Sequence, residues 1–170
     1  MELVQFTIPW SFIRVRCRLT WRQALFGIEN SLVDPGLPVE MAVDRLIEKS
    51  EGSSTLLELA SMGQEEAVSS LVETLADEEA TEDDGRMRDL WAYLALAWVY
   101  ENRGSFADPL GVVESIYADM GYPEAIAKFV RYMPAVGPDL GSEEANERRL
   151  MHNWKQFIDT EADRRGKDQG

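Results

Sequence analysis

Three carboxylates in the first third of the chain have the spacing of a metal-binding ridge. Glu40, Asp44 and Glu48 follow one another at intervals of four residues, so a helix would place them on one face. Hard divalent cations prefer carboxylate oxygens, and a second helix would have to add further oxygens to complete such a site. A solvated acidic face is the competing interpretation and the one we favour. We therefore predict no metal site and no cofactor.

Nucleophilic catalysis has two candidate residues, because the chain contains one cysteine and one histidine. Cys17 lies between Arg16 and Arg18, and positive neighbours make an exposed thiol more reactive. His152 is distant in the sequence and has no evident partner for general-base catalysis. The glycine-rich phosphate-binding motifs and the HExxH, GxSxG and CxxC patterns are absent from the sequence. We predict no catalytic residues.

Acidic residues are concentrated between Gln64 and Asp84, a stretch without lysine or arginine. Its second half, DEEATEDDG, begins at Asp77, and its composition is typical of a mobile loop. Exposed charges steer an oppositely charged protein during association. The candidate partner-binding residues are therefore four acids of this segment: Glu78, Glu79, Asp83 and Asp84.

Positive charge is concentrated near the start of the chain, in a cluster of Arg14, Arg16, Arg18 and Arg22. We expect these arginines to pair with the chain's own acids. Two alternatives stay open. The cluster would otherwise form a local anion site, or a self-association surface that meets the acidic run of a second copy and produces a homodimer.

The charge balance restricts the class of partner. The 170 residues include 17 Lys and Arg against 31 Asp and Glu, a formal net charge of −14. Such a chain repels phosphate backbones and anionic lipids, so we expect neither nucleic-acid nor membrane binding. Residues 1–20 lack a secretory pattern, and the most apolar run, Leu90–Tyr100, is far shorter than the ~20 residues that cross a bilayer. We expect a cytoplasmic protein whose negative charge is compatible with binding a basic protein.

Helix signals recur along the chain. Thr20, Ser53 or Ser54, and Ser142 are expected N-caps. Helices are predicted after Pro9, from Trp21, over 38–49, after Ser53, after Gly63, over 109–120, over 123–133 and over 143–162. Residues 12–19, FIRVRCRL, also alternate apolar and basic residues with period two, which is a strand pattern. Helix is favoured there because the surroundings are helical, and strand stays open.

The segment RDLWAYLALAWVYENRG, near residues 88–102, carries apolar residues on all sides of a helix. Gly104 is expected to form its left-handed C-cap. We predict an all-α, single-domain bundle of about eight or nine helices around this central apolar helix, spanning 1–165, with a frayed tail at 166–170. The similar segments DPGLPVE at 34–40 and DPLGVVE at 108–114 suggest a helical-repeat arrangement as an alternative.

The strings LAWVYENR, DPLGVVESIYADMGYPEAI and FVRYMP, between Leu90 and Pro134, resemble a bacterial family catalogued as domain of unknown function 2247. LTWRQALFGIEN near the N-terminus fits the same pattern, so the likeness covers most of the chain. The family has no assigned activity to carry onto residues. The resemblance implies a small cytoplasmic bacterial protein of a type discussed as immunity partners of secreted toxins.

The sequence therefore favours a non-enzymatic protein-binding module, most specifically an immunity-type protein. Such a protein neutralises a basic toxin by steric and electrostatic blocking. Two alternatives are kept. One is an enzyme with a dispersed, metal-assisted carboxylate site built on Glu40, Asp44 and Glu48, and the other is a structural homodimer.

Overall fold

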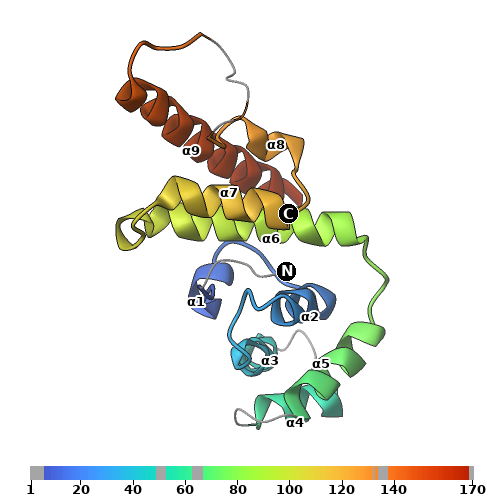
Figure 1. Ribbon diagram of the computed structural model, residues 1–170. Coiled ribbons are helices and arrows are strands. Elements are labelled where there is room, and N and C mark those ends of the chain that lie inside the picture. Colours follow the sequence, from blue (N-terminus) through green and yellow to red (C-terminus); the bar gives the residue numbers. More distant parts are fainter. Residues whose placement is uncertain (1–5, 49–52, 63–66, 132, 134–137, 169–170) are drawn as a thin grey trace. The chain divides into compact units, whose positions relative to one another are not determined.

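The structure, a computed structural model, describes residues 6–48, 53–62, 67–131, 133 and 138–168 (Figure 1). Within these ranges the regular elements are nine α-helices and one 3-10 helix, without a strand. The all-α prediction and the predicted number of helices are confirmed. Residue contacts divide the chain into two compact units, with the boundary between Met87 and Arg88. The single domain over 1–165 stays a prediction, and each unit is described by itself.

In the part of the N-terminal unit that the structure describes, five helices precede α6 (Asp84–Glu101). They are α1 (Trp10–Ile13), α2 (Trp21–Glu29), α3 (Leu37–Ile47), α4 (Ser54–Ala60) and α5 (Ala67–Asp77). Helix α3 packs against α4, and α5 packs against α2 and α4. The packed faces supply fully buried residues such as Trp21, Ala24, Met41, Leu56 and Val72. Helical spacing alone does not identify every buried face, because Val43 and Ile47 belong to the apolar pattern of α3 and are nevertheless exposed.

Local capping explains where two of these helices begin. Thr20 and Gln23 form a capping box at α2, in which Gln23 N donates to Thr20 Oγ1 (3.1 Å) and Thr20 N donates to Gln23 Oε1 (3.0 Å). Ser53 Oγ accepts from Leu56 N (3.1 Å) at α4. Both predicted N-caps are confirmed, because a cap depends on residues only three positions apart.

Residues 12–19 are neither a long helix nor a strand. Helix α1 ends at Ile13, a turn follows over 14–16, and 17–20 are irregular. The period-two pattern does not persist in burial, because Cys17 and Leu19 are buried whereas Val15 is 74% exposed. The described residues offer no neighbouring strand with which this segment could pair. The prediction of a helix here is wrong beyond Ile13.

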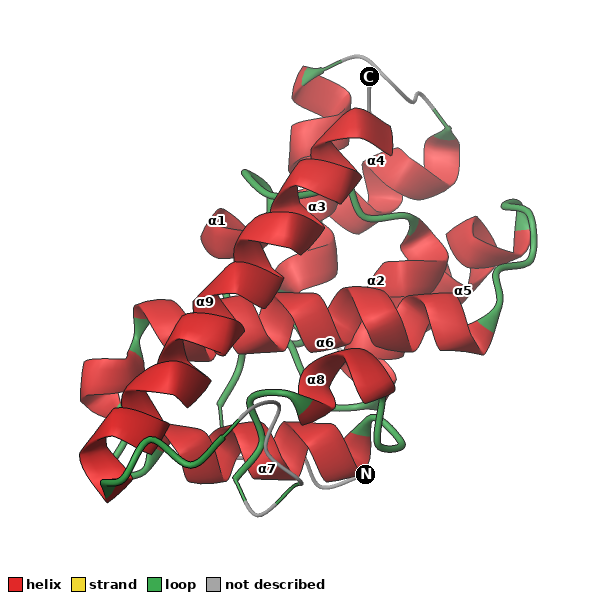
Figure 2. Cartoon of the chain, turned by 90° about the horizontal axis from the view of Figure 1, so that it is seen from above, coloured by secondary structure: helices red, strands yellow, loops and turns green. Residues whose placement is uncertain are grey.

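The C-terminal unit contains most of α6 (Asp84–Glu101) and the elements that follow it. These are the 3-10 helix η1 (Arg103–Ser105), α7 (Pro109–Asp119), α8 (Glu124–Ala127) and α9 (Glu143–Asp168). Helix α9 crosses α6 (Figure 2), and buried Trp154 donates from Nε1 to the carbonyl of Leu96 (3.2 Å) at the crossing. Ser142 Oγ accepts from Ala145 N (3.1 Å), which confirms the predicted N-cap of α9.

Helix α6 is buried on all sides over its middle turns. Every residue from Leu90 to Ala97 is buried, Trp91 completely, and Trp98 is half-buried. Yet no helix in the described part of the chain is long and apolar enough to span a bilayer. Gly104 does not form the expected C-cap, since it lies in η1; the end of α6 is instead closed by Asn102, whose Nδ2 donates to Trp98 O (2.9 Å).

The predicted helix over 123–133 is only one turn long. Helix α8 ends at Ala127, and the chain then turns so that buried Phe129 packs against the rings of Trp154 and Phe157, with centroids 6.5 and 5.4 Å away. Asn153 Nδ2 donates to Lys128 O (3.1 Å) at this turn. Contacts with α9 therefore outweigh the local helical pattern.

Two further predictions from the sequence differ from the structure. The Asp-Pro segments that suggested a repeat start their helices differently, because α3 begins three residues after Asp34 whereas α7 begins directly after Asp108. Asp34 Oδ1 accepts from Gly36 N (2.8 Å), and Asp108 Oδ2 pairs with Arg131 Nη2 (2.7 Å).

Helix α9 runs beyond the expected end at 162 and includes 166–168, the start of the predicted tail.

Arg131 holds α7 to the segment after α8, and this pairing predicts a pH effect. Its guanidinium also pairs with Glu114 (2.6 Å), and its hydrogen bond to Asp108 lowers the pKa of Asp108 from the ordinary 3.8. A lowered folded-state pKa stabilises above the unfolded value and loses that stabilisation as the pH falls through the folded value. Arg131→Met should therefore cost about 1 kcal/mol at neutral pH and less at about pH 3.

Urea denaturation at the two pH values measures both costs, with Arg148→Met, a change at an exposed arginine of α9, as control. An Arg131→Met loss of equal size at both pH values would contradict the pairing.

Candidate functional site

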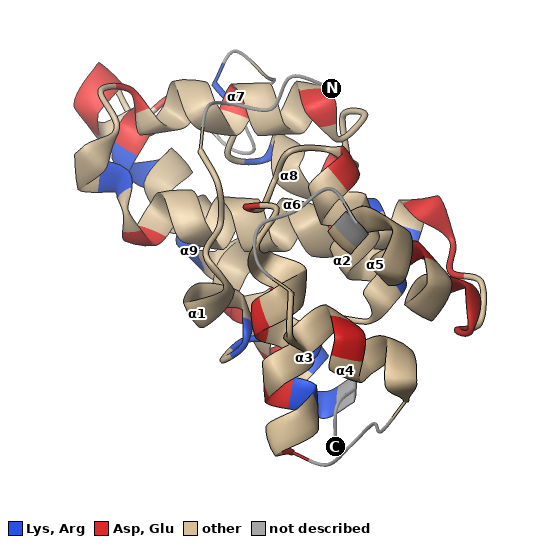
Figure 3. Cartoon of the chain, turned by 90° about the horizontal axis from the view of Figure 1, so that it is seen from below, with Lys and Arg blue, Asp and Glu red and all other residues tan. Residues whose placement is uncertain are grey.

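The predicted partner-binding acids lie in and beside the loop between α5 and α6. We call residues 78–83 the acidic loop; Figure 3 shows the concentration of Asp and Glu there. A loop is confirmed over residues 78–83, whereas Asp77 ends α5 and Asp84 and Gly85 begin α6. The acids of the loop differ in exposure, because Glu79 and Glu82 are half-buried whereas Glu78 and Asp83 are exposed. Neighbouring acids that look equivalent in the sequence therefore differ in how much of each side chain solvent reaches.

Glu79 binds the amino end of α2. Its Oε2 accepts from Trp21 N (3.1 Å) and its Oε1 from Arg22 N (2.9 Å). Together with the Thr20–Gln23 capping box, these bonds give every one of the first four N–H groups of α2 an acceptor. The carboxylate also lies at the positive end of the helix dipole. Glu79 was predicted to bind a partner protein, and within the fold its carboxylate accepts hydrogen bonds from α2.

Two further bonds tie the acidic loop to α2. The Arg22 side chain donates from Nη2 to the backbone carbonyl of Glu79 (3.3 Å), and Gln23 donates from Nε2 to Glu82 Oε1 (3.0 Å). Residues on the first turn of α2 therefore contact both ends of the loop. The segment expected to be mobile has hydrogen bonds to a helix that lies more than 50 residues earlier in the sequence.

The other three candidate acids, Glu78, Asp83 and Asp84, are exposed. Asp83 Oδ2 accepts from Arg86 N (3.3 Å) at the start of α6, and Asp84 is the first residue of that helix. Acids in a first turn are stabilised by the helix dipole and keep their charge at the surface. These three residues present negative charge to solvent, whereas Glu79 is engaged by α2.

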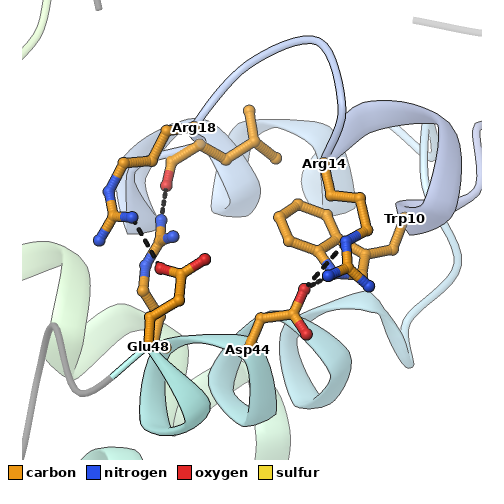
Figure 4. Close-up of polar contacts among 7 residues, drawn as sticks. Trp10, Arg14, Arg18, Asp44 and Glu48 are labelled. Carbon is orange, nitrogen blue, oxygen red and sulfur yellow. Dashed lines mark hydrogen bonds and ion pairs between the residues drawn. The ribbon is translucent and has the colours of Figure 1, made fainter.

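The arginine cluster and the acidic ridge pair with each other (Figure 4). Arg14 Nε lies 3.4 Å from Asp44 Oδ2, and Arg18 Nη1 lies 2.9 Å from Glu48 Oε2. Asp44 Oδ2 also accepts from Trp10 Nε1 (2.8 Å), and its side chain is only 16% exposed. The predicted pairing of arginines with the chain's own acids is confirmed at these two positions.

The remaining arginines of the cluster have other contacts. Arg16 donates to Phe12 O (2.9 Å), and its guanidinium carbon lies 3.5 Å from the centroid of the Phe12 ring. On α3, buried Arg45 donates to the carbonyl of Leu19. The irregular segment 14–19 is thus attached to α3 by side chains rather than by backbone pairing.

Residues considered for metal binding or catalysis are not brought together. Among the residues that the structure describes, no three or more His, Cys, Asp or Glu side chains are grouped to hold a metal ion. Ridge residues Asp44 and Glu48 bind arginines, and Glu40 is exposed. Cys17 is buried, so an approaching substrate does not reach its thiol, and His152 is exposed on α9.

A groove that the sequence did not predict lies between α2 and the acidic loop. We call it the α2 groove; its cavity volume is about 310 Å³, and its lining includes Leu25, Phe26, Glu29, Glu82, Asp84 and Met87. The residues from α2 recur at helical spacing on one face, with Arg22 one turn before Leu25. Only the fold brings this face next to the loop.

These features define an acidic, all-helical protein with a carboxylate-rich loop tied to a helix amino end. The chain belongs to the family DUF2247, described as an uncharacterized protein conserved in bacteria, whose model matches residues 10–162. No curated protein matches the chain, and no solved structure matches it. The resemblance found in the sequence is therefore confirmed, and the comparisons add no activity.

The engagement of Glu79 predicts a stability difference between neighbouring acids. Glu79→Ala leaves two N–H groups of α2 without their acceptor and removes a charge from the helix dipole, so it should cost about 2 kcal/mol. Glu78→Ala, the matched control at an exposed position, should change stability by less than about 0.5 kcal/mol. Urea denaturation of both variants measures the difference; equal losses would refute the assignment.

Proposed function

We propose that this chain is a non-enzymatic protein-binding module whose partner is a basic protein. Its most specific form is an immunity-type protein that neutralises a bacterial toxin by covering a cationic surface. The observation that carries the proposal is the exposed negative charge of Glu78 and Asp83 in the acidic loop and of Asp84 at the start of α6, while Glu79 fixes the loop to α2. A positioned set of charges suits association with one oppositely charged surface.

The partners of the basic residues strengthen this proposal. Arg14 and Arg18 bind Asp44 and Glu48, so much of the positive charge near the N-terminus is balanced locally. The chain as a whole carries a formal charge of −14, and the acidic loop adds to that field without a lysine or arginine of its own. Such a field raises the encounter rate with cations and disfavours nucleic acid.

Both earlier alternatives are disfavoured by the same ion pairs. A metal-assisted site on the ridge would have to displace Arg14 from Asp44 and Arg18 from Glu48. A homodimer that joins the arginine cluster to the acidic loop of a second copy would have to break these contacts too. Each surface pair contributes at most about 1 kcal/mol, so this cost is small, but the described residues include no group of ligands that would favour a metal site.

The proposal is tested with the polypeptide encoded by the gene next to this one. Co-expression should restore growth if that polypeptide is toxic, and the purified pair should form a stoichiometric complex by size-exclusion chromatography. A neighbouring gene for a metabolic enzyme, together with failure of its product to bind the chain, would contradict an immunity function.

The exposed loop acids predict how the complex forms. Changing Glu78 to Gln and Asp83 and Asp84 to Asn should slow association with the basic partner about tenfold at low ionic strength. The rates of variant and parent should converge in concentrated salt, because the Debye length falls to about 3 Å at 1 M. Stopped-flow association measured over a salt series gives both values.

The matched control neutralises three exposed acids outside the acidic loop, namely Glu58, Glu124 and Asp163. It changes the net charge equally but leaves the loop intact, so its effect on the association rate should be clearly smaller. Equal slowing by the two triple variants would mean that net charge alone acts, and the loop would have no special part.

A further inference from the structure

We infer that the α2 groove receives an arginine side chain of the basic partner protein. This inference rests on the proposed function, because it names the group that the binding module would recognise. The groove lies beside the acidic loop, so charges that attract a basic protein lead directly to it.

Part of the lining of the groove is apolar. Leu25 and Phe26 come from α2 and are half-buried, and Met87 comes from the first turns of α6 and is buried. Half-buried apolar side chains in a groove gain free energy when a ligand covers them, at roughly 25 cal/mol for each Å² removed from water. The methylene groups of a long side chain provide such a cover.

The lining of the groove also includes three acidic side chains. Glu29 and Asp84 are exposed carboxylates on two different elements, and Glu82 adds a half-buried carboxylate that also accepts from Gln23. Arg22 lines the groove as well, and its Nη2 donates to the backbone of the acidic loop. Three carboxylates against one guanidinium leave an excess of negative charge, so the groove favours a cation.

The size and chemistry of the groove select arginine. A volume of about 310 Å³ is at the lower end for ligand sites, and it suits one long side chain better than a helix. A guanidinium offers five N–H donors in a plane, binds carboxylates with two hydrogen bonds and stacks on an aromatic ring such as Phe26. Lysine supplies a charge but no planar fork, so it should bind less well.

The inference is tested first with a peptide probe on the full chain. The tripeptide acetyl-Gly-Arg-Gly-amide is titrated while backbone amide shifts are followed by NMR. We expect shifts centred on Leu25, Phe26 and Met87, and none from the same peptide with uncharged citrulline in place of arginine. Shifts spread over acids elsewhere, such as Glu58, or an equal response to citrulline, would overturn the inference.

Charge reversal at Glu29, an acidic lining residue of the groove, provides the second test. Glu29→Lys should weaken binding of the arginine peptide by about fivefold, which corresponds to the upper end of what one exposed ion pair contributes. Glu58→Lys makes the same charge change on α4, outside the groove, and should leave peptide binding nearly unchanged. Equal weakening by both variants would show that the groove has no specific part.

The same variants separate this inference from the proposed function. If the protein partner binds Glu29→Lys as tightly as the parent chain, the groove assignment fails while the binding function stands. If the peptide binds in the groove but the neighbouring gene product does not bind the chain, the groove stands and the proposed function fails. A dimer detected by sedimentation in the parent chain and abolished by Glu29→Lys would overturn the arginine assignment.

Discussion

The contact between the Glu79 carboxylate and the amino end of α2 determines how the acidic loop is arranged. A helix start leaves backbone N–H groups without intrahelical acceptors, and here Glu79 accepts from Trp21 and Arg22. The loop backbone is thereby held beside α2, which forms the α2 groove and leaves Glu78 and Asp83 facing solvent. One acid of the segment stabilises the fold, and its neighbours Glu78 and Asp83 keep their charge at the surface.

Much of the secondary structure could be predicted from the local sequence, because helix caps depend on residues only a few positions apart. Thr20, Ser53 and Ser142 were identified as N-caps from residue type and the apolar pattern after them, and all three accept the expected hydrogen bond. The predictions that failed were decided by distant contacts. Helix α8 is short because Phe129 packs on α9, and α6 ends through Asn102 rather than at Gly104.

The candidate site could be predicted only in part, for the same reason. Composition located the acidic loop, but the partners of Glu79 lie 57 and 58 residues away in the sequence. Likewise, the acidic ridge and the arginine cluster were each recognised, whereas the pairing of Arg18 with Glu48, 30 residues apart, depends on the fold. Spacing within one helix shows which side chains share a face, but it does not show what that face meets.

Amide hydrogen exchange at the start of α2 tests the central claim most directly. N–H groups in a first helical turn are unprotected unless a side chain accepts from them. The account predicts slow exchange at Trp21 and Arg22 in the parent chain and fast exchange at both in Glu79→Ala, with Gln23 still protected by Thr20. Fast exchange at Trp21 and Arg22 in the parent chain, or protection that survives Glu79→Ala, would contradict it.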